Sequence, residues 1–192
     1  MSDQRDYKLE KKFRDNCRNL MVYKLPKWDE IPEINLYMDQ LVTLLEKYLA
    51  PYQIEKEEKM ITKAMINNYV KDEIIPKPVN KKYNKEHVAY LLVICMLKST
   101  VSISNIKSII KCQKEYRSAE ELLNLVDDIL ELSADFFINK VTLKVESLLQ
   151  TDQNSDLVFT SLAITMGLIS NTSKMVSEIS LKTRKEAKGE EV

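Results

Sequence analysis

Glycine is nearly absent from this chain, and that scarcity limits what the chain can fold into. Only two of its 192 residues are glycine and five are proline, whereas Leu, Ile, Lys and Glu are abundant. Such a composition favours helices, and the length allows one large domain or two small ones with a real core. We therefore expect an all-α protein without the glycine-rich loops that bind phosphates or dinucleotides.

A short segment in the middle of the chain has the pattern of a helix with two unlike faces. Read as a helix, it runs from Thr62 to about Lys71. One face collects the apolar residues Met65, Ile66, Tyr69 and Val70. The opposite face carries the polar residues Lys63, Asn67, Asn68 and Lys71. Asparagine can pair with adenine and lysine with guanine or phosphate, so this pattern is typical of a DNA-reading helix. An ordinary surface helix would show the same pattern.

A stiff basic loop follows this helix and favours the DNA-reading interpretation. It carries Lys77, Lys81 and Lys82 and ends at Tyr83. Between Lys59 and Lys85, seven lysines stand against two acidic residues, a local balance of +5 in a chain of zero formal net charge. Lysines near a reading helix supply the sequence-independent, salt-sensitive part of DNA affinity. A helix followed by a basic loop is the outline of a winged helix-turn-helix.

The C-terminal half has the opposite charge. From Ser118 to Gln150, seven acidic residues stand against Lys140 and Lys144. This asymmetry suggests that only the middle of the chain approaches nucleic acid. The three cysteines form no C-x-x-C pair and no signal peptide is apparent, which favours a cytoplasmic protein with reduced thiols. The apolar runs are too short to span a membrane, so we expect no membrane association.

The other elements follow from caps and apolar stripes. Asn35 can cap a helix to about Leu49, Asn84 or Lys85 opens the next, and Ser102 or Ser104 caps another. Ser118 begins a long helix with the stripe Leu122, Val126, Ile129, Leu130, Phe137, Val141 and Leu148. A last helix, from about Ser155 to Arg184, should turn inward Val158, Leu162, Leu168, Ile169, Met175, Val176 and Ile179. We expect a helix or arm over residues 1–24, a DNA-binding domain over 25–116 and a helical hairpin over 117–192.

Nothing in the chain indicates catalysis, a metal site or a cofactor. His87 is the only histidine, which argues against a histidine-based metal site or triad, and we expect a surface or partly buried polar residue. Asp127 and Asp128 project at different angles around a helix and are best interpreted as a solvated acidic face. Small residues recur in the last helix and should allow close helix approach: Ser161, Thr165, Gly167 and Thr172. A less favoured alternative is an effector pocket that they line together with Phe136 or Phe137.

The middle of the chain resembles the DNA-binding domain of MerR-type regulators. In that family the reading helix carries Thr-Leu-Arg-Tyr-Tyr and ends in Gly-Leu-Ile-Pro, and the wing closes with Arg-Tyr-Tyr. The matching stretches here are Ala64 to Tyr69, Glu73-Ile74-Ile75-Pro76 and Lys82-Tyr83-Asn84. The family's arginine, first tyrosine and glycine are replaced by Asn67, Asn68 and Glu73. With no glycine in the wing, Asn80 must take any left-handed turn.

A closer resemblance covers roughly Tyr23 to Leu125. Leu-Pro-x-Trp, Leu-Tyr-Met-Asp-Gln at 36–40, Met-Ile-Asn-Asn-Tyr-Val-Lys at 65–71 and Lys-Lys-Tyr at 81–83 are similar to a bacterial family catalogued as domain of unknown function 1836. That family brings no settled activity. What the resemblance implies is a MerR-like winged helix-turn-helix, followed here by the long C-terminal hairpin.

Together these observations predict a bacterial transcription regulator that binds specific double-stranded DNA. The residues expected to contact DNA are Thr62, Lys63, Asn67, Asn68, Tyr69, Lys71, Lys77, Lys81 and Lys82. We expect a homodimer held by the C-terminal helices, because two-fold pairing is the usual way for small reading heads to gain site length. The alternative is a non-enzymatic adaptor that keeps the winged-helix shape but binds another protein.

Overall fold

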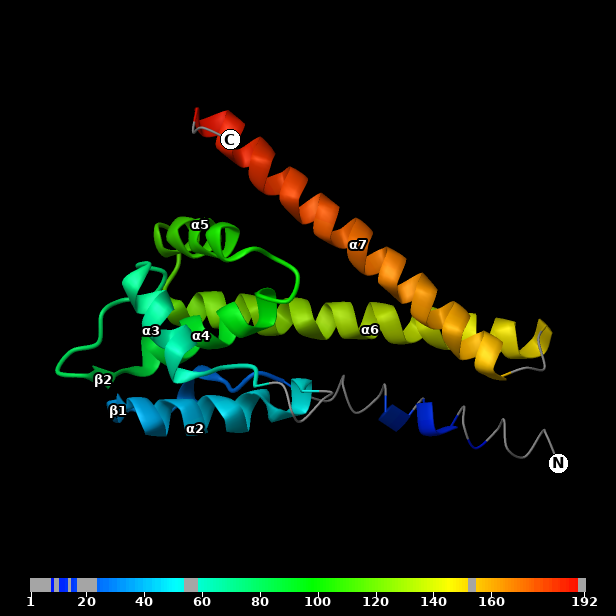
Figure 1. Ribbon diagram of the computed structural model, residues 1–192, viewed down its shortest axis with the longest axis horizontal. Coiled ribbons are helices and arrows are strands. Elements are labelled where there is room, and N and C mark those ends of the chain that lie inside the picture. The colour runs from blue at the N-terminus through cyan, green and yellow to red at the C-terminus, as the bar shows by residue number, and fades with distance from the viewer. Residues whose placement is uncertain are drawn as a thin grey trace. The chain divides into compact units, whose positions relative to one another are not determined.

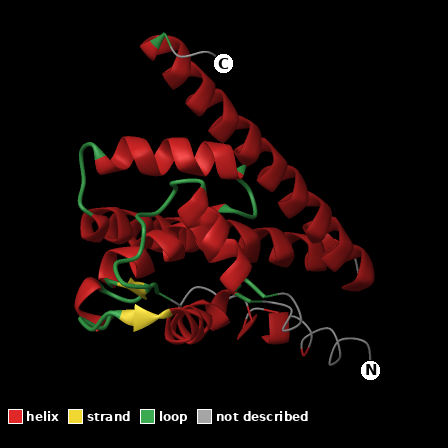
Figure 2. Ribbon diagram, turned by 60° about the vertical axis from the view of Figure 1, so that its left-hand side comes forward, coloured by secondary structure: helices red, strands yellow, loops and turns green. Residues whose placement is uncertain are grey.

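Helices make up most of the computed structural model, which describes residues 8, 11–13, 15–16, 24–53, 59–151 and 155–189 (Figure 1). The helices are α2 (Met38–Leu49), α3 (Lys63–Lys71), α4 (Lys85–Leu97), α5 (Ile103–Lys114), α6 (Ala119–Thr151) and α7 (Ser155–Lys188). Short 3-10 helices lie at η1 (Trp28–Glu30) and η2 (Ala50–Tyr52), and the strands β1 (Leu36–Tyr37) and β2 (Lys82–Tyr83) form one small sheet (Figure 2). The expected helical character is therefore confirmed.

The chain divides into two compact units. One spans Tyr23–Leu130, and the other combines Met1–Val22 with Glu131–Val192. The first unit extends past Tyr116 because the start of α6 completes its core: Ala119, Leu122 and Leu123 are all buried there. The predicted arm over residues 1–24 falls mostly outside the described residues.

The core of the Tyr23–Leu130 unit is built around α4. Every side chain from His87 to Cys95 is buried, so this helix is enclosed on all sides, as expected for one that is apolar all round. α2 and α5 pack against it, and α3 packs against α2. Burial raises the pKa of Cys95 to about 11, so this thiol stays protonated and acts as a small apolar residue.

The start of α2 differs from the prediction. Asn35 does not cap it, because Leu36 and Tyr37 form a strand antiparallel to β2, with Leu36 opposite Tyr83. The helix begins at Met38, and the Gln40 side chain accepts a hydrogen bond from the Tyr37 amide at 2.9 Å. A strand of two residues leaves too short a pattern to be recognised in sequence.

The other helix starts were predicted correctly. Thr62, Asn84 and Ser102 each cap a helix by accepting a hydrogen bond from a backbone amide three residues later. Ser118 and Glu121 form a reciprocal capping box: the Ser118 amide donates to the Glu121 carboxylate and the Glu121 amide donates to the Ser118 hydroxyl. Those bonds to Ser118 lower the pKa of Glu121.

The acidic pair on α6 is less solvated than expected. Asp127 is half-buried and accepts a hydrogen bond from the Leu25 amide at 2.9 Å, which attaches the start of the unit to α6. Burial, followed by the charge of Asp127, raises the pKa of Tyr52 to about 12. Asp127 is therefore a structural residue, and Asp128 alone fits the exposed acidic face.

The apolar stripe of α7 does not turn inward as predicted. Val158 and Leu162 are buried, but the rest of the predicted set is exposed in this chain: Leu168, Ile169, Met175, Val176 and Ile179. On α6, Leu122 is buried whereas Ile129 is exposed, and the side chains of Phe137, Val141 and Leu148 lie outside the described set. A stripe read from periodicity shows which residues share a face, but it cannot show what covers that face.

The small residues of α7 do not mark a close helix approach within the chain. Thr165 and Thr172 donate their hydroxyls to carbonyls of their own helix, at Ser161 and Leu168. A Cβ added at Gly167 would meet nothing within 4 Å. The predicted close approach is therefore absent at Gly167, and the two hydroxyls are satisfied within their own helix, as Ser and Thr commonly are.

No helix in the described part of the chain combines the length and apolar character needed to cross a bilayer.

Candidate nucleic-acid interface

α3 presents the two faces that its sequence predicts. Ile66 and Tyr69 are buried, and Lys63, Asn67, Asn68 and Lys71 are exposed. Tyr69, expected to contact DNA, is only 5% exposed and belongs to the core, where burial raises the pKa of its phenol. Because Tyr69 packs into the core on the inner face of α3, it is not part of the exposed candidate surface.

α3 ends in a left-handed turn made without glycine. The Ile74 amide donates to the Tyr69 carbonyl at 2.9 Å and the Glu73 amide to the Val70 carbonyl at 3.1 Å, which is the Schellman pattern. Glu73 occupies the left-handed position with φ 56°. The turn redirects the chain immediately after the polar face of α3.

The basic loop closes with a tight turn from Val79 to Lys82. The amides of Val79 and Lys82 each donate to the other residue's carbonyl, at 3.2 and 2.9 Å. Asn80 and Lys81 both have positive φ, 52° and 61°, which defines a type I′ turn. The prediction for Asn80 is confirmed, and Lys81 joins it in the left-handed region. Lys81 therefore stands at the exposed tip of the turn.

Contacts within the protein occupy three of the predicted DNA-binding residues. The Thr62 hydroxyl caps α3 by accepting from the Met65 amide at 3.2 Å. Lys63 forms an exposed ion pair with Asp39, and the Lys82 ammonium lies 5.0 Å from the centre of the Tyr37 ring. An exposed ion pair is weak, so an external anion can compete with Asp39 for Lys63.

The remaining predicted residues are open to solvent. Lys71, Lys77 and Lys81 are exposed, and none of them forms an ion pair with another residue that the structure describes. Asn67 and Asn68 expose their amides on α3. The structure thus keeps five residues as an unengaged polar surface on α3 and the loop that follows it.

His87 fixes the loop to α4. It is 4% exposed and thus buried, so the prediction of a surface or partly buried residue is wrong. Its Nε2 lies 3.1 Å from the Pro76 carbonyl, which can only accept, and its Nδ1 lies 3.1 Å from the donating Asn84 amide. Burial lowers the pKa of the imidazole, and the ammonium of Lys114 acts in the same direction. Neutral His87 therefore ties the exit of α3 to the start of α4.

Sequence reasoning also missed a buried lysine. The Lys85 ammonium is 2.6 Å from a Glu33 carboxylate oxygen and 4.9 Å from the centre of the Trp28 ring. These contacts hold the segment from Trp28 to Glu33 against α4. Lys85 therefore contributes to the local charge but not to the exposed surface. The partners are far from Lys85 in sequence, and nothing near it predicts them.

A second basic surface lies on α5. Lys107, Lys111 and Lys114 recur at intervals of four and three residues and are exposed, while Ile106 and Ile110 are buried on the neighbouring flank. The spacing alone places the lysines on one side of a helix, so the signal was present in the sequence. This surface was not among the predicted DNA contacts.

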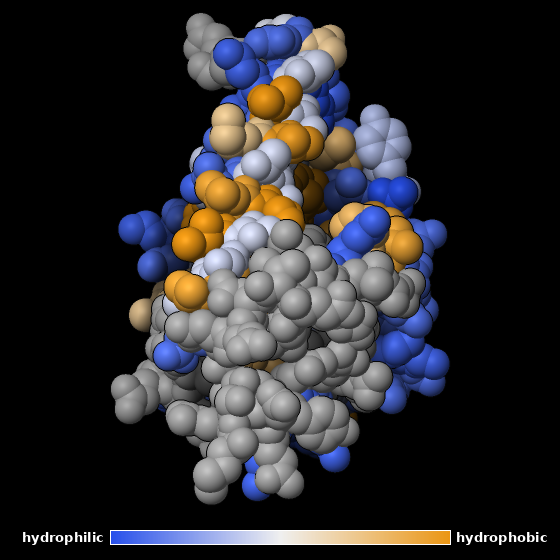
Figure 3. All heavy atoms as spheres, turned by 90° about the vertical axis from the view of Figure 1, so that its right-hand side faces the viewer, coloured by the Kyte–Doolittle hydropathy of each residue, from blue (hydrophilic) through white to orange (hydrophobic). Residues whose placement is uncertain are grey.

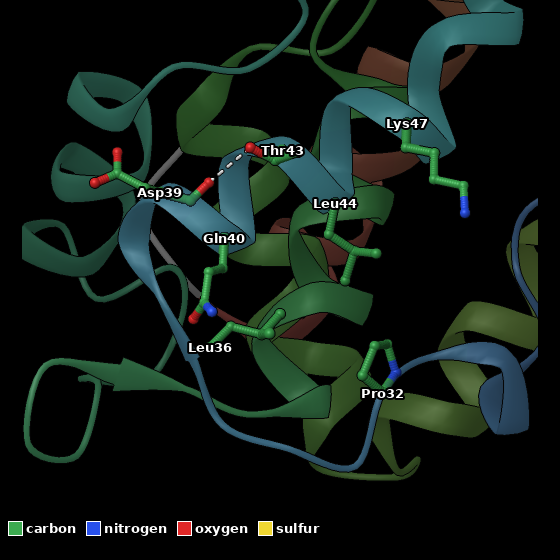
Figure 4. Close-up of a pocket in the computed structure, with 7 residues that line it drawn as sticks. All are labelled: Pro32, Leu36, Asp39, Gln40, Thr43, Leu44 and Lys47. Atoms are coloured by element: carbon green, nitrogen blue, oxygen red, sulfur yellow. Dashed lines mark hydrogen bonds between the residues drawn. The ribbon is translucent and has the colours of Figure 1, made fainter.

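An apolar groove lies on the outer side of α2 (Figure 4). It has a volume of about 450 Å³ and is lined by Pro32, Leu36, Asp39, Gln40, Thr43, Leu44 and Lys47. Several of its polar groups are engaged: Thr43 donates to the Asp39 carbonyl at 3.0 Å and Gln40 accepts from the Tyr37 amide. The groove therefore offers mainly the apolar surfaces of Pro32, Leu36 and Leu44 (Figure 4). Within the described part of the chain, no cluster of His, Cys, Asp and Glu could hold a metal ion.

Comparison with known proteins gives one match. Residues 26–129, more than half of the chain, match the model of the family described as Domain of unknown function (DUF1836). No curated protein and no solved structure shows a significant match. The matched range nearly coincides with the Tyr23–Leu130 unit that contains α3, the type I′ turn and α5. The chain belongs to the DUF1836 family.

Proposed function

We propose that the protein is a transcription regulator that binds specific double-stranded DNA through a MerR-like winged helix-turn-helix. In this proposal α2 and α3 form the helix-turn-helix and the type I′ turn is the tip of the wing. The observation that carries it is the polar face of α3, where Asn67 and Asn68 stand exposed between Lys63 and Lys71. Tyr69 and Ile66 hold this face rigidly on the core, as base readout requires.

The two parts of this surface have different roles in the proposal. The amides of Asn67 and Asn68 can exchange paired hydrogen bonds with a base edge in the major groove, which gives sequence preference. Lys77 and Lys81 lie on the loop and bind phosphate oxygens as point charges, which fixes the position of the protein on the duplex. Lys71, at the end of α3, can serve either role.

The proposed regulator acts as a homodimer through α7. Apolar side chains gather along this helix (Figure 3), and Leu157, Ile164, Leu168, Met175 and Ile179 are all more than half exposed. Their spacing keeps them on one side of a helix of 34 residues, about 51 Å long at ~1.5 Å per residue. Exposed apolar stripes of this extent usually mark an interface, and a second copy offers a self-complementary partner.

The first experiment measures DNA binding against salt. The protein should enrich a defined set of fragments from genomic DNA, and its affinity for them should fall steeply between low and moderate salt. Replacing Asn67 or Asn68 by Ala should cost roughly 1–3 kcal/mol on the preferred site and relax the preference at one base pair. Asn124→Ala, which changes an exposed asparagine on α6, is the control and should bind like the wild type. Unchanged profiles for both α3 variants would remove α3 from the proposal.

The second candidate is an adaptor that binds another protein, and the groove on α2 favours it. Pro32, Leu36 and Leu44 could receive apolar side chains of a partner, because aliphatic surface in a concave site suits such contacts. The same salt experiment separates the two functions. Weak binding to every DNA fragment, with little salt dependence, would support the adaptor and reject the regulator.

A further inference from the structure

The lysines of α5 form a continuous flank on the surface of the Tyr23–Leu130 unit. Lys107, Lys111 and Lys114 follow one another along the helix, and Ser104 continues the flank toward its start. Like charges at these spacings destabilise a helix, and the chain as a whole is neutral. Neither Lys107 nor Lys111 forms an ion pair with any other residue in the part of the chain that the structure describes. Their ammonium groups are therefore not held in an ion pair with any described residue.

Two observations locate the C-terminal end of this flank, at Lys114, near the loop that follows α3. Lys114 lies with its ammonium 4.8 Å from the centre of the Tyr90 ring and close enough to His87 to lower the pKa of the imidazole. His87 in turn contacts the Pro76 carbonyl at 3.1 Å, directly before Lys77. The C-terminal end of α3 also lies beside α5 in both ribbon views (Figures 1 and 2).

The acidic residues near the flank gather at its C-terminal end. Glu86 on α4 acts on both His87 and Tyr90, and Glu115 lies at the end of α5. The acidic start of α6 includes Glu121, whose carboxylate is engaged by Ser118. Lys107 and Lys111 remain as two exposed ammonium groups, about two turns and one turn before Lys114 on the same side of α5.

We propose that the α5 flank is a second DNA-backbone contact, in which Lys107 and Lys111 bind phosphates of the duplex held by α3. This inference rests on the function proposed above and extends its contact surface. Lysines bind phosphates as point charges without reading bases, so the flank adds affinity and orientation but no sequence preference. Lys114, stacked on Tyr90, positions the end of α5 against α4.

The test compares three variants with the wild-type protein. Lys107→Gln/Lys111→Gln removes the proposed contacts, and Lys77→Gln/Lys81→Gln removes two lysines of the loop. Lys140→Gln/Lys174→Gln makes the same charge change at exposed sites on α6 and α7. Each variant is measured for affinity to the selected DNA over a range of salt. Hydroxyl-radical footprints of the same complexes report which backbone positions are protected.

The α5 variant should lower the slope of log K against log salt by about 1.8, because each lost phosphate contact is worth about 0.9. It should also lose backbone protection at one side of the footprint while keeping the base preference. An α5 variant with the salt slope and footprint of the control would overturn this inference. If the loop variant then still loses salt slope and backbone protection, the proposed function stands. Absence of DNA binding by the wild type would overturn both.

Discussion

The strained backbone conformation of Glu73 should lower the stability of the protein, so replacing Glu73 by glycine should raise it. The residue sits at φ 56°, where a Cβ crowds the following carbonyl at a cost of roughly 1–2 kcal/mol. Glycine removes that cost, but its greater conformational freedom stabilises the unfolded chain by about 0.5–1 kcal/mol. The difference predicts that Glu73→Gly stabilises the protein by about 0.5–1 kcal/mol. For a chain of this size, that corresponds to a rise of the melting temperature by about 2–4 °C per kcal/mol.

Asp72 provides a matched control for this measurement. It precedes Glu73, is also exposed and acidic, but has φ −81°, so glycine there gains no relief of strain. Asp72→Gly removes the same charge and should lower the melting temperature. Thermal unfolding followed by circular dichroism, at one salt concentration, compares the two variants with the wild type. If both substitutions lower the melting temperature equally, the conclusion that Glu73 is strained in a left-handed conformation is wrong.

Three further predictions follow from other parts of the structure. The imidazole of His87, the only histidine, should titrate in NMR below its ordinary pKa of 6.5, and a normal or raised value would contradict its burial. Because the folded pKa is the lower one, its contribution to stability is present above pH ~6.5 and is lost as the pH falls toward the folded pKa. A chain ending at Leu130 should fold and sediment as a monomer, whereas one ending at Arg117 should not fold, because it lacks Ala119, Leu122 and Leu123. Lys81→Gly should raise the melting temperature, since Asn-Gly suits a type I′ turn, and should weaken DNA binding. A dimeric Leu130 fragment, or a Lys81 variant that binds DNA normally, would contradict these expectations.

Local signals in the sequence were sufficient for most of the helical elements. Thr62, Ser102 and Ser118 cap helices through hydrogen bonds to amides three residues away, and such bonds depend on neighbouring residues only. The polar face of α3 likewise follows from a period of 3.6 residues. Both kinds of feature are encoded within a single turn or two of the chain.

Features that depend on distant residues were not predictable from the same signals. His87 is buried because Pro76 and Tyr83 approach it, and Asp127 is engaged because the Leu25 amide reaches it across the unit. The boundary at Leu130 also escaped prediction, because charge changes sign near Ser118 while the core continues into α6. Composition marks changes in surface chemistry, whereas a domain boundary is set by packing.

The scarcity of glycine gives the proposed DNA-binding surface an unusual backbone. Among the described residues, the non-glycine positions with positive φ are Glu73, Asn80 and Lys81, and all three lie between α3 and β2. Asparagine tolerates this conformation, but glutamate and lysine do so only at an energetic cost. At Lys81 the side chain that glycine would remove is one that the proposal assigns to phosphate binding. Strain at such a position is expected where function needs the side chain, since stability alone would favour glycine. Glu73 lacks that justification, because its negative charge opposes DNA, and it is therefore the position where stability and DNA affinity should improve together.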